Sequence, residues 1–412
     1  MSNVSTLNVF LYGELIGTIT NVGNDRSLFA FTEDYIENTE RSILSLGFKD
    51  SLGELITEFK PTQTKLMPFF SNLLPEESMR KYLAERAGVN PVREFFLLWV
   101  LGQDLPGAIT IKPADGEELP PGISEPVDEG DGQKEAPMRF SLAGVQLKFS
   151  AVQHAPGGLT IPATGTGGSW IVKLPSSQFK GVPENEFATM ELARKLGMDV
   201  PETQLLDIGD IDNIPEGIGQ FGNRAFAIKR FDRTSDGQAV HIEDFAQVFG
   251  VYPHDKYKKA SMRNIAEVIG LEGQEKDVAE FVRRLVFNTL IGNADMHLKN
   301  WSLIYNDHQA ASIAPAYDFV STIPYFPDDS AALKVSRSKK FSDFTMDELS
   351  HLAAKARLPE KLVLDTAQET VELFHEHWKS EKKNLELASD VVKAIEKHLK
   401  EVPVAKKSNG YK

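Results

Sequence analysis

Two short stretches of the chain decide its fold: GNADMHLKN, residues 292–300, and AYDF, residues 316–319. They place a carboxylate at Asp295, a carboxamide five residues further on at Asn300, and a second carboxylate at Asp318. Phosphoryl transfer from ATP needs such a set, because one Asp accepts the proton of the attacking hydroxyl while an Asn and a second Asp hold Mg²⁺ against the phosphates. The sequence therefore predicts a site for ATP and Mg²⁺ with the chemistry of a kinase.

A single Asp that follows a helix, as Asp295 does, is most often a turn or cap residue. The second stretch favours a functional site over a turn, because Asp318 lies between Tyr317 and Phe319 and should be partly buried. A buried carboxylate is costly unless it binds a metal or a hydrogen-bond donor. His297 is an alternative metal ligand, but no matching His or Glu spacing completes such a site. Kinases of proteins, lipids and small molecules share this set, so it specifies the reaction better than the substrate.

A lysine interrupts an apolar run at Lys173, in IVKLP, residues 171–175. This context is typical of the lysine that pairs with the α- and β-phosphates of ATP. The alternative is a lysine on an edge strand that discourages aggregation. A Glu on the following helix should hold the lysine, and Glu186 and Glu191 are the candidates. Only one of the two can face Lys173; the spacing does not decide between them, and we favour Glu186.

Two further segments are candidates for nucleotide contacts. The stretch SLAGVQLK, residues 141–148, is placed to cover the phosphates, although it has neither the three glycines of a kinase loop nor the lysine pattern of a Walker motif. Lys229-Arg230-Phe231 ends a predicted strand at the junction of two lobes, where backbone groups can pair with the adenine edge. The alternative fits this second segment equally well: an ordinary strand end without a nucleotide contact, whose arginine forms its hydrogen bonds within the protein.

The composition excludes several classes of function. With 412 residues, 41% hydrophobic and 25% charged, the chain is ordinary for a folded protein and long enough for more than one core. A net charge of −14 argues against sequence-blind binding of nucleic acid. The absence of cysteine excludes disulfides, thiolate nucleophiles and Cys-ligated zinc. No apolar run approaches the ~18 residues that span a bilayer, so we expect a cytoplasmic protein without membrane association.

The pattern of strands and helices divides the chain into five parts. A small α+β unit is expected over 1–112, with a hairpin at 7–19, a strand at 28–31 and helices at 75–87 and 90–101. Residues 113–137 are acidic and rich in Pro and Gly, which predicts a linker or mobile loop. Strands dominate 138–235, helices dominate 236–400, and residues 401–412 form a polar, basic tail expected to be disordered.

The two larger parts match the layout of a protein kinase. In the first, strands are predicted at 138–152, 170–174, 204–208 and 224–231, with one helix at 185–196. In the second, apolar residues recur with helical spacing, which predicts one buried helix face; they are Val278, Phe281, Val282, Leu285 and Val286. Further helices are predicted at 362–378 and 388–399. We therefore expect an α+β, protein-kinase-like bilobal fold with an extra N-terminal subdomain.

Taken in order, these motifs resemble the HipA-type serine/threonine kinases, the toxins of bacterial toxin–antitoxin pairs. The resemblance runs from about residue 7 to about residue 380 and rests on seven segments: FSLAGVQLK (140–148), VKLP (172–175), ENEFATM (184–190), KRFDR (229–233), EDF (243–245), GNADMHLKN (292–300) and AYD (316–318). The N-terminal hairpin unit is similar to the extra subdomain that this family carries ahead of its kinase core.

The resemblance implies a role for each motif residue. It makes Asp295 the catalytic base and Lys173 the phosphate-pairing lysine, with Mg²⁺ on Asn300 and Asp318. It places adenine against backbone groups of Lys229 and Phe231. It also places the rings of His297 and Tyr317 near the nucleotide. Ser141 matches the serine that such kinases autophosphorylate, in the nucleotide loop that also contains Gly144. In that family the added charge ejects the loop and blocks ATP binding.

The resemblance also implies partners. The family's usual partner is a small helix-turn-helix antitoxin, HipB-like, which binds operator DNA as a dimer. With its charge of −14, this chain should contact DNA mainly through that antitoxin. Its substrates come from the translation machinery, best known among the aminoacyl-tRNA synthetases. We therefore expect an ATP- and Mg²⁺-dependent, growth-arresting kinase; the alternatives are a small-molecule kinase and a catalytically silent pseudokinase that serves as a corepressor.

Overall fold

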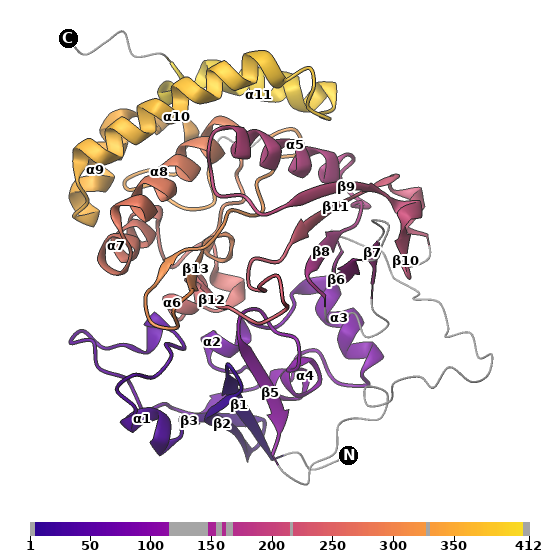
Figure 1. Ribbon diagram of the computed structural model, residues 1–412, viewed down its shortest axis with the longest axis vertical. Coiled ribbons are helices and arrows are strands. Elements are labelled where there is room, and N and C mark those ends of the chain that lie inside the picture. Colours follow the sequence, from indigo (N-terminus) through magenta and orange to yellow (C-terminus); the bar gives the residue numbers. More distant parts are fainter. Residues whose placement is uncertain are drawn as a thin grey trace.

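The computed structural model describes residues 5–114, 147–153, 159–161, 168–214, 217–326 and 330–406. Within these ranges the chain forms an N-terminal unit (5–114), a strand-rich lobe built mainly from 147–229, and a helical lobe from 241 to 406 (Figure 1). Ser141, Gly144 and nearly all of the acidic segment 113–137 lie outside the described residues.

The N-terminal unit is a five-stranded sheet in the order β4-β3-β2-β1-β5, and helices accompany it. The predicted hairpin is confirmed: β1 and β2 pair antiparallel around Tyr12 and Gly13, which have φ of 53° and 84°. Positive φ at both central residues is the turn that matches the twist of a hairpin, and glycine adopts it without strain. The strands are β1 (Thr6–Leu11), β2 (Glu14–Gly23), β3 (Arg26–Phe31), β4 (Thr62–Gln63) and β5 (Ile109–Pro113); the helices are α1 (Glu33–Glu37), α2 (Pro68–Ser71), α3 (Glu77–Arg86) and α4 (Glu94–Leu101).

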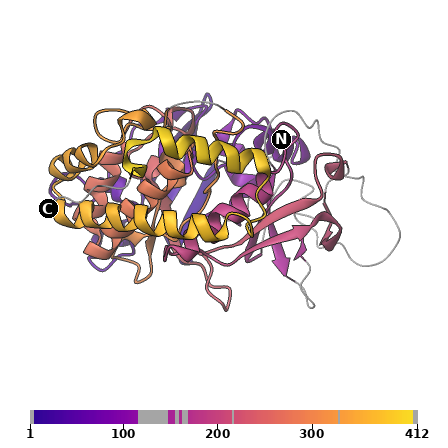
Figure 2. The same cartoon turned by 90° about the horizontal axis from the view of Figure 1, so that it is seen from above.

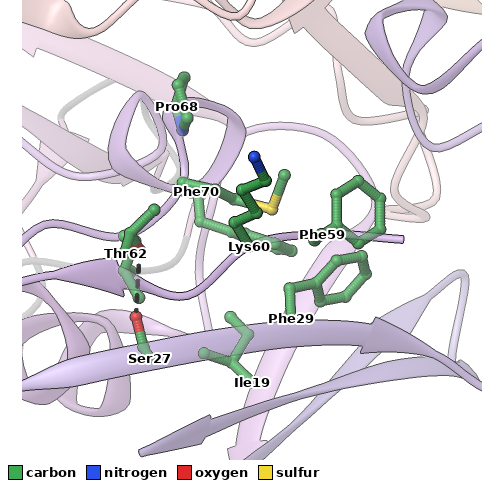
Figure 3. A pocket seen from close by; sticks show the side chains of 10 residues that line it. Ile19, Ser27, Phe29, Phe59, Lys60, Thr62, Pro68 and Phe70 are labelled. Atoms are coloured by element: carbon green, nitrogen blue, oxygen red, sulfur yellow. Dashed lines mark hydrogen bonds between the residues drawn. The ribbon is translucent and has the colours of Figure 1, made fainter. Parts of the chain in front are cut away.

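An apolar cavity of about 210 Å³ lies within this unit, between the sheet and the segment 59–70. Its walls include Ile19 and Phe29 from the sheet and Phe59 and Phe70 from the opposite side (Figure 3). All of its lining residues belong to the N-terminal unit, so none of the predicted nucleotide or metal ligands reaches it.

The strand-rich lobe is a six-stranded sheet in the order β10-β7-β6-β8-β11-β9. Helix α5 packs against β9 and β11, which confirms the predicted helix at 185–196. Strand β8, which carries Lys173, pairs with β6 on one side and β11 on the other, so the edge-strand interpretation of Lys173 is wrong. The elements are β6 (Lys148–Gln153), β7 (Leu159–Thr160), β8 (Trp170–Lys173), α5 (Val182–Lys195), β9 (Thr203–Asp207), β10 (Ile211–Asp212) and β11 (Arg224–Lys229).

The helical lobe contains the predicted helices and one small sheet that was not predicted. The apolar face of α8 is buried, as its spacing indicated, and α10 packs along α8; Figure 2 shows the C-terminal helices lying over this lobe. The sheet β12-β13-β14 escaped prediction because its strands have only two to four residues. The elements are β12 (His241–Asp244), α6 (Phe245–Val248), α7 (Met262–Glu272), α8 (Glu275–Leu290), β13 (Ser302–Tyr305), β14 (Ser312–Ile313), α9 (Met346–Ala356), α10 (Glu360–Glu381) and α11 (Ser389–Glu401).

The expectation of a disordered tail from 401 onward is wrong for its first part. Helix α11 extends to Glu401, and a short 3₁₀ helix, Pro403–Ala405, follows it. Val402 and Val404 are buried in the core, and the Val404 amide donates to the Phe344 carbonyl at 3.1 Å. The apolar residues of this segment dock it, while residues 407–412 lie outside the described part. Among the helices that the structure describes, none combines the length and apolar character needed to cross a bilayer.

Buried polar contacts join the N-terminal unit to both lobes. The buried Glu243 carboxylate accepts hydrogen bonds from the Leu46 amide, at 2.9 Å, and from the hydroxyls of Ser45 and Tyr305. A second anchor uses the KRFDR segment, where Arg230 contacts Asp104 at 3.0 Å. The N-terminal unit is therefore an integral part of the fold, attached at the point where the two lobes meet.

Candidate active site

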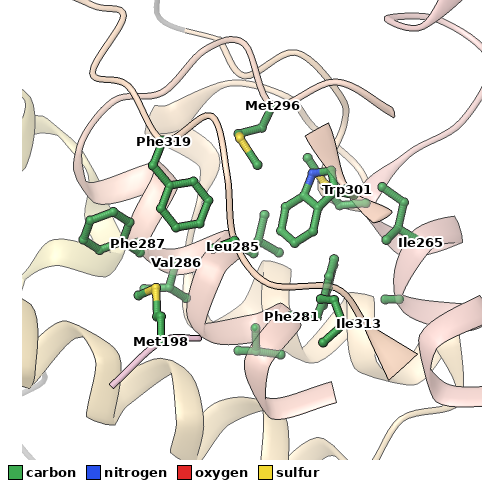
Figure 4. Packing of buried hydrophobic residues seen from close by; sticks show 14 of the residues in the cluster. Met198, Ile265, Phe281, Leu285, Val286, Phe287, Met296, Trp301, Ile313 and Phe319 are labelled. Carbon is green, nitrogen blue, oxygen red and sulfur yellow. The ribbon is translucent and has the colours of Figure 1, made fainter. Parts of the chain in front are cut away.

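One hydrophobic core holds the three polar residues of the two motifs, 292–300 and 316–319. Each of Asp295, Asn300 and Asp318 is followed directly by a buried apolar residue, and the three neighbours belong to a single cluster beneath the site (Figure 4); they are Met296, Trp301 and Phe319. Because interiors are close-packed, these anchors leave little freedom to the backbone beside them. Two separate stretches of chain are thereby brought to the same place.

Asn293 fastens the two stretches together. Its Oδ1 accepts from the Asp295 amide at 3.0 Å, and its Nδ2 donates to the Asp318 carbonyl at 3.2 Å. The Asn300 side chain closes the loop from the other end, since its Nδ2 donates to the Asp295 carbonyl at 2.9 Å. This leaves Asn300 Oδ1 without a hydrogen bond from any described residue, and a carboxamide oxygen of this kind suits Mg²⁺. Asn293 received no role from the sequence.

Asp318 is a partly buried carboxylate in an uncommon backbone conformation. Its φ is 57°, in the left-handed region that Asp tolerates better than most residues and that clusters at functional sites. Burial raises the pKa of Asp318, but its ion pair with Lys173 and the nearby charge of Lys148 outweigh burial and hold the pKa at about 2. Asp318 is therefore ionised at neutral pH, as a metal ligand must be.

Lys173 reaches this carboxylate from the strand-rich lobe. Its Nζ donates to Glu186 Oε1 at 2.5 Å and forms an ion pair with Asp318, so it links the two lobes. The choice between the two glutamates is thereby decided for Glu186, which is fully buried on α5. Glu191 instead pairs with Arg194 and accepts from the Thr203 hydroxyl at 2.6 Å. Five residues turn a helix by about 500°, so the two glutamates point about 140° apart.

A second lysine shares this surface and was not assigned a role from the sequence. Lys148 on β6 lies directly opposite Lys173 on β8 in an antiparallel pair. Residues in such positions project from the same face, and like charges there repel. The Asp318 carboxylate offsets part of this repulsion, and a chain of phosphates is the kind of ligand that offsets the rest. The only signal for Lys148 in the sequence was its place at the end of SLAGVQLK.

Asp295 lies on the other side of the site, with a partner that the sequence did not suggest. The Tyr257 hydroxyl donates to Asp295 Oδ1 at 2.7 Å. Burial raises the pKa of Asp295, the Tyr257 hydrogen bond works against that rise, and the Asp318 carboxylate adds to it. A carboxylate whose pKa lies above its usual range is a better proton acceptor than an exposed one.

Comparison with known proteins identifies the family. One family model, described as the HipA N-terminal domain, matches residues 7–112, and another, described as the HipA-like C-terminal domain, matches residues 140–378. The chain belongs to the HipA family of kinases. It is 58% identical to Y4dM of Sinorhizobium fredii (strain NBRC 101917 / NGR234), a protein named provisionally as a kinase, with 97% of each chain covered.

Two further matches come from Shewanella oneidensis MR-1. The serine/threonine-protein kinase toxin HipA is 27% identical to this chain over 79% of it and 77% of the toxin. The HipA structure solved with HipB and its operator DNA superposes with a TM-score of 0.68 at 22% identity, covering 98% of this chain and all of the other. At that identity the likeness concerns the fold, and it confirms the predicted bilobal, kinase-like α+β architecture with its N-terminal subdomain.

On the predicted nucleotide side of this HipA-family kinase, two aromatic rings form a wall. The rings of Phe231 and Tyr317 stack with centroids 5.7 Å apart, and the Tyr317 hydroxyl donates to the Lys299 carbonyl at 2.9 Å. The Lys229 amide donates to the Glu202 carbonyl at 2.8 Å, which leaves only the carbonyl of Lys229 for the predicted role. The Phe231 amide makes no hydrogen bond within the described residues.

His297 is buried. Its ring packs edge-on against the ring of Tyr257, the hydrogen-bond partner of Asp295, with the two ring centroids 5.0 Å apart. Burial and the charge of Lys256 lower the pKa of His297 to about 3, so its ring is neutral. Within the described ranges no cluster of three His, Asp or Glu side chains is arranged to bind a metal, so the alternative site centred on His297 is not found there. Mg²⁺ needs only one or two protein ligands when phosphates supply the others.

Proposed function

We propose that this HipA-family kinase is an ATP- and Mg²⁺-dependent serine/threonine protein kinase that acts as a growth-arresting toxin. The observation that carries the proposal is the ion pair of Lys173 with Asp318 next to the Asp295 loop, residues 292–300. It brings a cation for phosphates, a carboxylate for metal and a candidate base together at the junction of the lobes. Phosphoryl transfer needs little else from the protein.

The residues present fit ATP and Mg²⁺. Lys148 and Lys173 form a dibasic surface that would hold phosphates, while Asp318 and the free Oδ1 of Asn300 would hold the metal. Bound Mg²⁺ would neutralise the charge that develops on the transferred phosphoryl group. The Phe231 amide, the Lys229 carbonyl and the rings of Tyr317 and His297 would frame the base. Gly144 belongs to the segment proposed to cover the phosphates.

In the proposed reaction Asp295 accepts the proton of the substrate hydroxyl. Tyr257 occupies its Oδ1, so Oδ2 is the oxygen that would receive the proton. Asn293 and Asn300 hold the backbone of Asp295 in place, so the base does not need to reorganise as the reaction proceeds. Lys173, fixed by Glu186, would keep the phosphates aligned with the attacking oxygen.

Membership of the HipA family supports a proposal for the regulation and the partners of this chain. We propose that Ser141 is autophosphorylated and that the added charge, next to a site for triphosphate, hinders ATP binding. A HipB-like helix-turn-helix antitoxin, binding as a dimer, would neutralise the toxin and carry most contacts to operator DNA, with which the pair would corepress its operon. The complex of the Shewanella relatives with operator DNA supports this partner. The proposed substrates are components of translation, among them the aminoacyl-tRNA synthetases.

The test is phosphate mapping. Purified protein is incubated with ATP·Mg²⁺, alone and with a set of aminoacyl-tRNA synthetases, and phosphorylated residues are located by mass spectrometry. The expected result is phosphate on Ser141 and on one synthetase, with neither in Asp295→Asn. Absence of phosphate from every sample containing the wild-type chain would reject the proposal and favour a pseudokinase corepressor. Equal labelling by Asp295→Asn would reject Asp295 as the base.

A further inference from the structure

A glutamate of the N-terminal unit lies between two lysines of the helical lobe. Glu76, just ahead of α3, contacts Lys256 Nζ through Oε2 at 2.8 Å and Lys299 Nζ through Oε1 at 2.7 Å. The contacts are sheltered, since the three side chains are 27%, 16% and 15% exposed, respectively. Burial raises the pKa of Glu76, but the two lysines lower it to about 2, so the carboxylate is ionised.

Each of these lysines precedes a residue of the proposed site. Lys256 precedes Tyr257, whose hydroxyl donates to Asp295, and the Lys256 carbonyl accepts from the Leu298 amide at 3.3 Å. Glu76 therefore connects to the Asp295 loop through a single residue, Lys256.

The other lysine connects Glu76 to the far end of the same loop. Lys299 precedes Asn300, its carbonyl accepts from the Tyr317 hydroxyl at 2.9 Å, and its Nζ also donates to the Asn72 carbonyl at 3.2 Å. A single carboxylate thus contacts both Lys256, which precedes the hydrogen-bond partner of Asp295, and Lys299, which precedes the proposed metal ligand Asn300. Loss of alignment of about 1 Å at such a site can cost about 100-fold in rate.

The charges show why the carboxylate matters. Lys256 and Lys299 would repel each other without a shared anion, and the other carboxylates on which their charges act are Asp295 for Lys256 and Asp244 for Lys299. The charge of Lys256 already lowers the pKa of Asp295. With Glu76 neutral, Lys256 would be drawn toward Asp295, where it would compete with the substrate hydroxyl, and Lys299 would be drawn toward Asp244.

We propose that Glu76 is a positioning residue for phosphoryl transfer, through which the N-terminal unit fixes the Asp295 loop at Asp295, through Lys256 and Tyr257, and at Lys299. This inference rests on the proposed function, because it assigns Glu76 a part in the same reaction. It also gives the N-terminal unit a task in catalysis in addition to any role in binding a partner.

The chain offers a matched control. Lys49 and Glu272 also form an ion pair between the N-terminal unit and the helical lobe, at 3.2 Å, but neither residue contacts the Asp295 loop. Substitution Lys49→Gln therefore removes one charge pair from the same interface without touching the site.

The experiment compares full-length wild type with Glu76→Gln, Glu76→Asp, Lys256→Met, the double variant Glu76→Gln/Lys256→Met, and Lys49→Gln. Initial rates of ADP release and of phosphate incorporation from ATP·Mg²⁺ give kcat and KM, equilibrium binding gives the Kd for ATP, and thermal unfolding gives Tm. We expect Glu76→Gln to lower kcat about 10- to 100-fold with the Kd for ATP within about 2-fold of wild type. Glu76→Asp should retain more activity than Glu76→Gln, and Lys49→Gln should match wild type.

The double variant separates positioning from stability. If Glu76 acts through Lys256, the losses in kcat will not add, since the second substitution removes an already broken contact. Additive losses, an unchanged kcat in Glu76→Gln, or an equal loss in Lys49→Gln would overturn the inference. A wild-type chain that transfers no phosphate would instead reject the proposed function, so the two failures are distinguishable. If Glu76→Gln lowers Tm strongly, Lys256→Met provides the same comparison from the other side of the contact.

Discussion

Lys148 and Lys173 face each other across neighbouring strands, one on β6 and one on β8, in direct antiparallel register. Two lysines in such a pair repel, and two carboxylates, Asp318 and Glu186, offset part of that repulsion. An arrangement that costs stability and gathers positive charge in one place is suited to an anion with several charges, such as the phosphates of a nucleotide.

Substitution Lys148→Met should therefore weaken ATP binding and leave the fold as stable as before or slightly more stable. A lost charge-assisted contact to phosphate is worth about 1.5–3 kcal/mol, so the Kd for ATP should rise about 10- to 100-fold, while the Kd for adenosine changes little. Calorimetric titration with both ligands and a thermal scan check this. Lys112→Met, on β5 of the N-terminal unit, is the control. A lower Tm with unchanged Kd would show that Lys148 is merely structural.

Substitution of Asp318 should affect ATP binding, and substitution of Asp295 should affect phosphoryl transfer. Asp318→Asn should weaken the binding of ATP in the presence of Mg²⁺, because a neutral amide binds the metal less tightly than a carboxylate and no longer balances the charges of Lys148 and Lys173. Asp295→Asn should leave that binding intact and slow phosphoryl transfer about 10²- to 10⁴-fold, the usual contribution of a general base. Binding titrations and single-turnover rates for both variants decide it. If both lose ATP binding, the division of roles proposed above is wrong.

Removal of the Tyr257 hydroxyl should shift the pH dependence of the reaction. The hydrogen bond to Asp295 lowers the pKa of that carboxyl, so Tyr257→Phe lets the pKa rise further. A base works only when deprotonated, so the acidic limb of the kcat/KM profile should move to higher pH in the variant. Profiles measured for wild type, Tyr257→Phe and the control Tyr252→Phe give the shift. A limb that moves to lower pH, or that moves equally in the control, contradicts the assignment.

The buried Glu243 that joins the N-terminal unit to β12 should make stability depend on pH. Burial raises the pKa of Glu243 from about 4.5 to about 7, with the hydrogen bonds from Ser45, Tyr305 and Leu46 working against the rise. At Glu243 the folded state therefore binds a proton more tightly than the unfolded state, and the contribution of this group to stability falls as pH rises from 4.5 through 7. Glu243→Gln lacks this titration, so the stability advantage of wild type should be largest below pH 4.5 and shrink toward pH 8. Denaturant unfolding of both proteins at several pH values measures it; a constant difference would refute the assignment.

Much of the architecture was readable from local patterns. The hairpin at Gly13, the strand that carries Lys173 and the buried face of α8 follow from alternation and helical periodicity, which depend on neighbours along the chain. The kinase-like fold was predicted from the motifs that carry Lys173, Asp295, Asn300 and Asp318. Each motif lies within a few neighbouring residues, and the motifs follow one another in the order found in kinases. Strands β13 and β14, with four and two residues, were too short to give a pattern, and the docking of Val402 and Val404 depends on a core formed elsewhere.

By itself, the sequence determined the order of elements and the residue types available for chemistry, because each is encoded within a few neighbouring positions. Only the tertiary structure decided that Glu186 rather than Glu191 holds Lys173, that Tyr257 donates to Asp295, and that Glu76 reaches Lys256, 180 positions away. Such contacts depend on how packed elements are oriented around shared cores. No spacing along the chain specifies that orientation, since it is set by the burial of apolar faces and the pairing of buried charges.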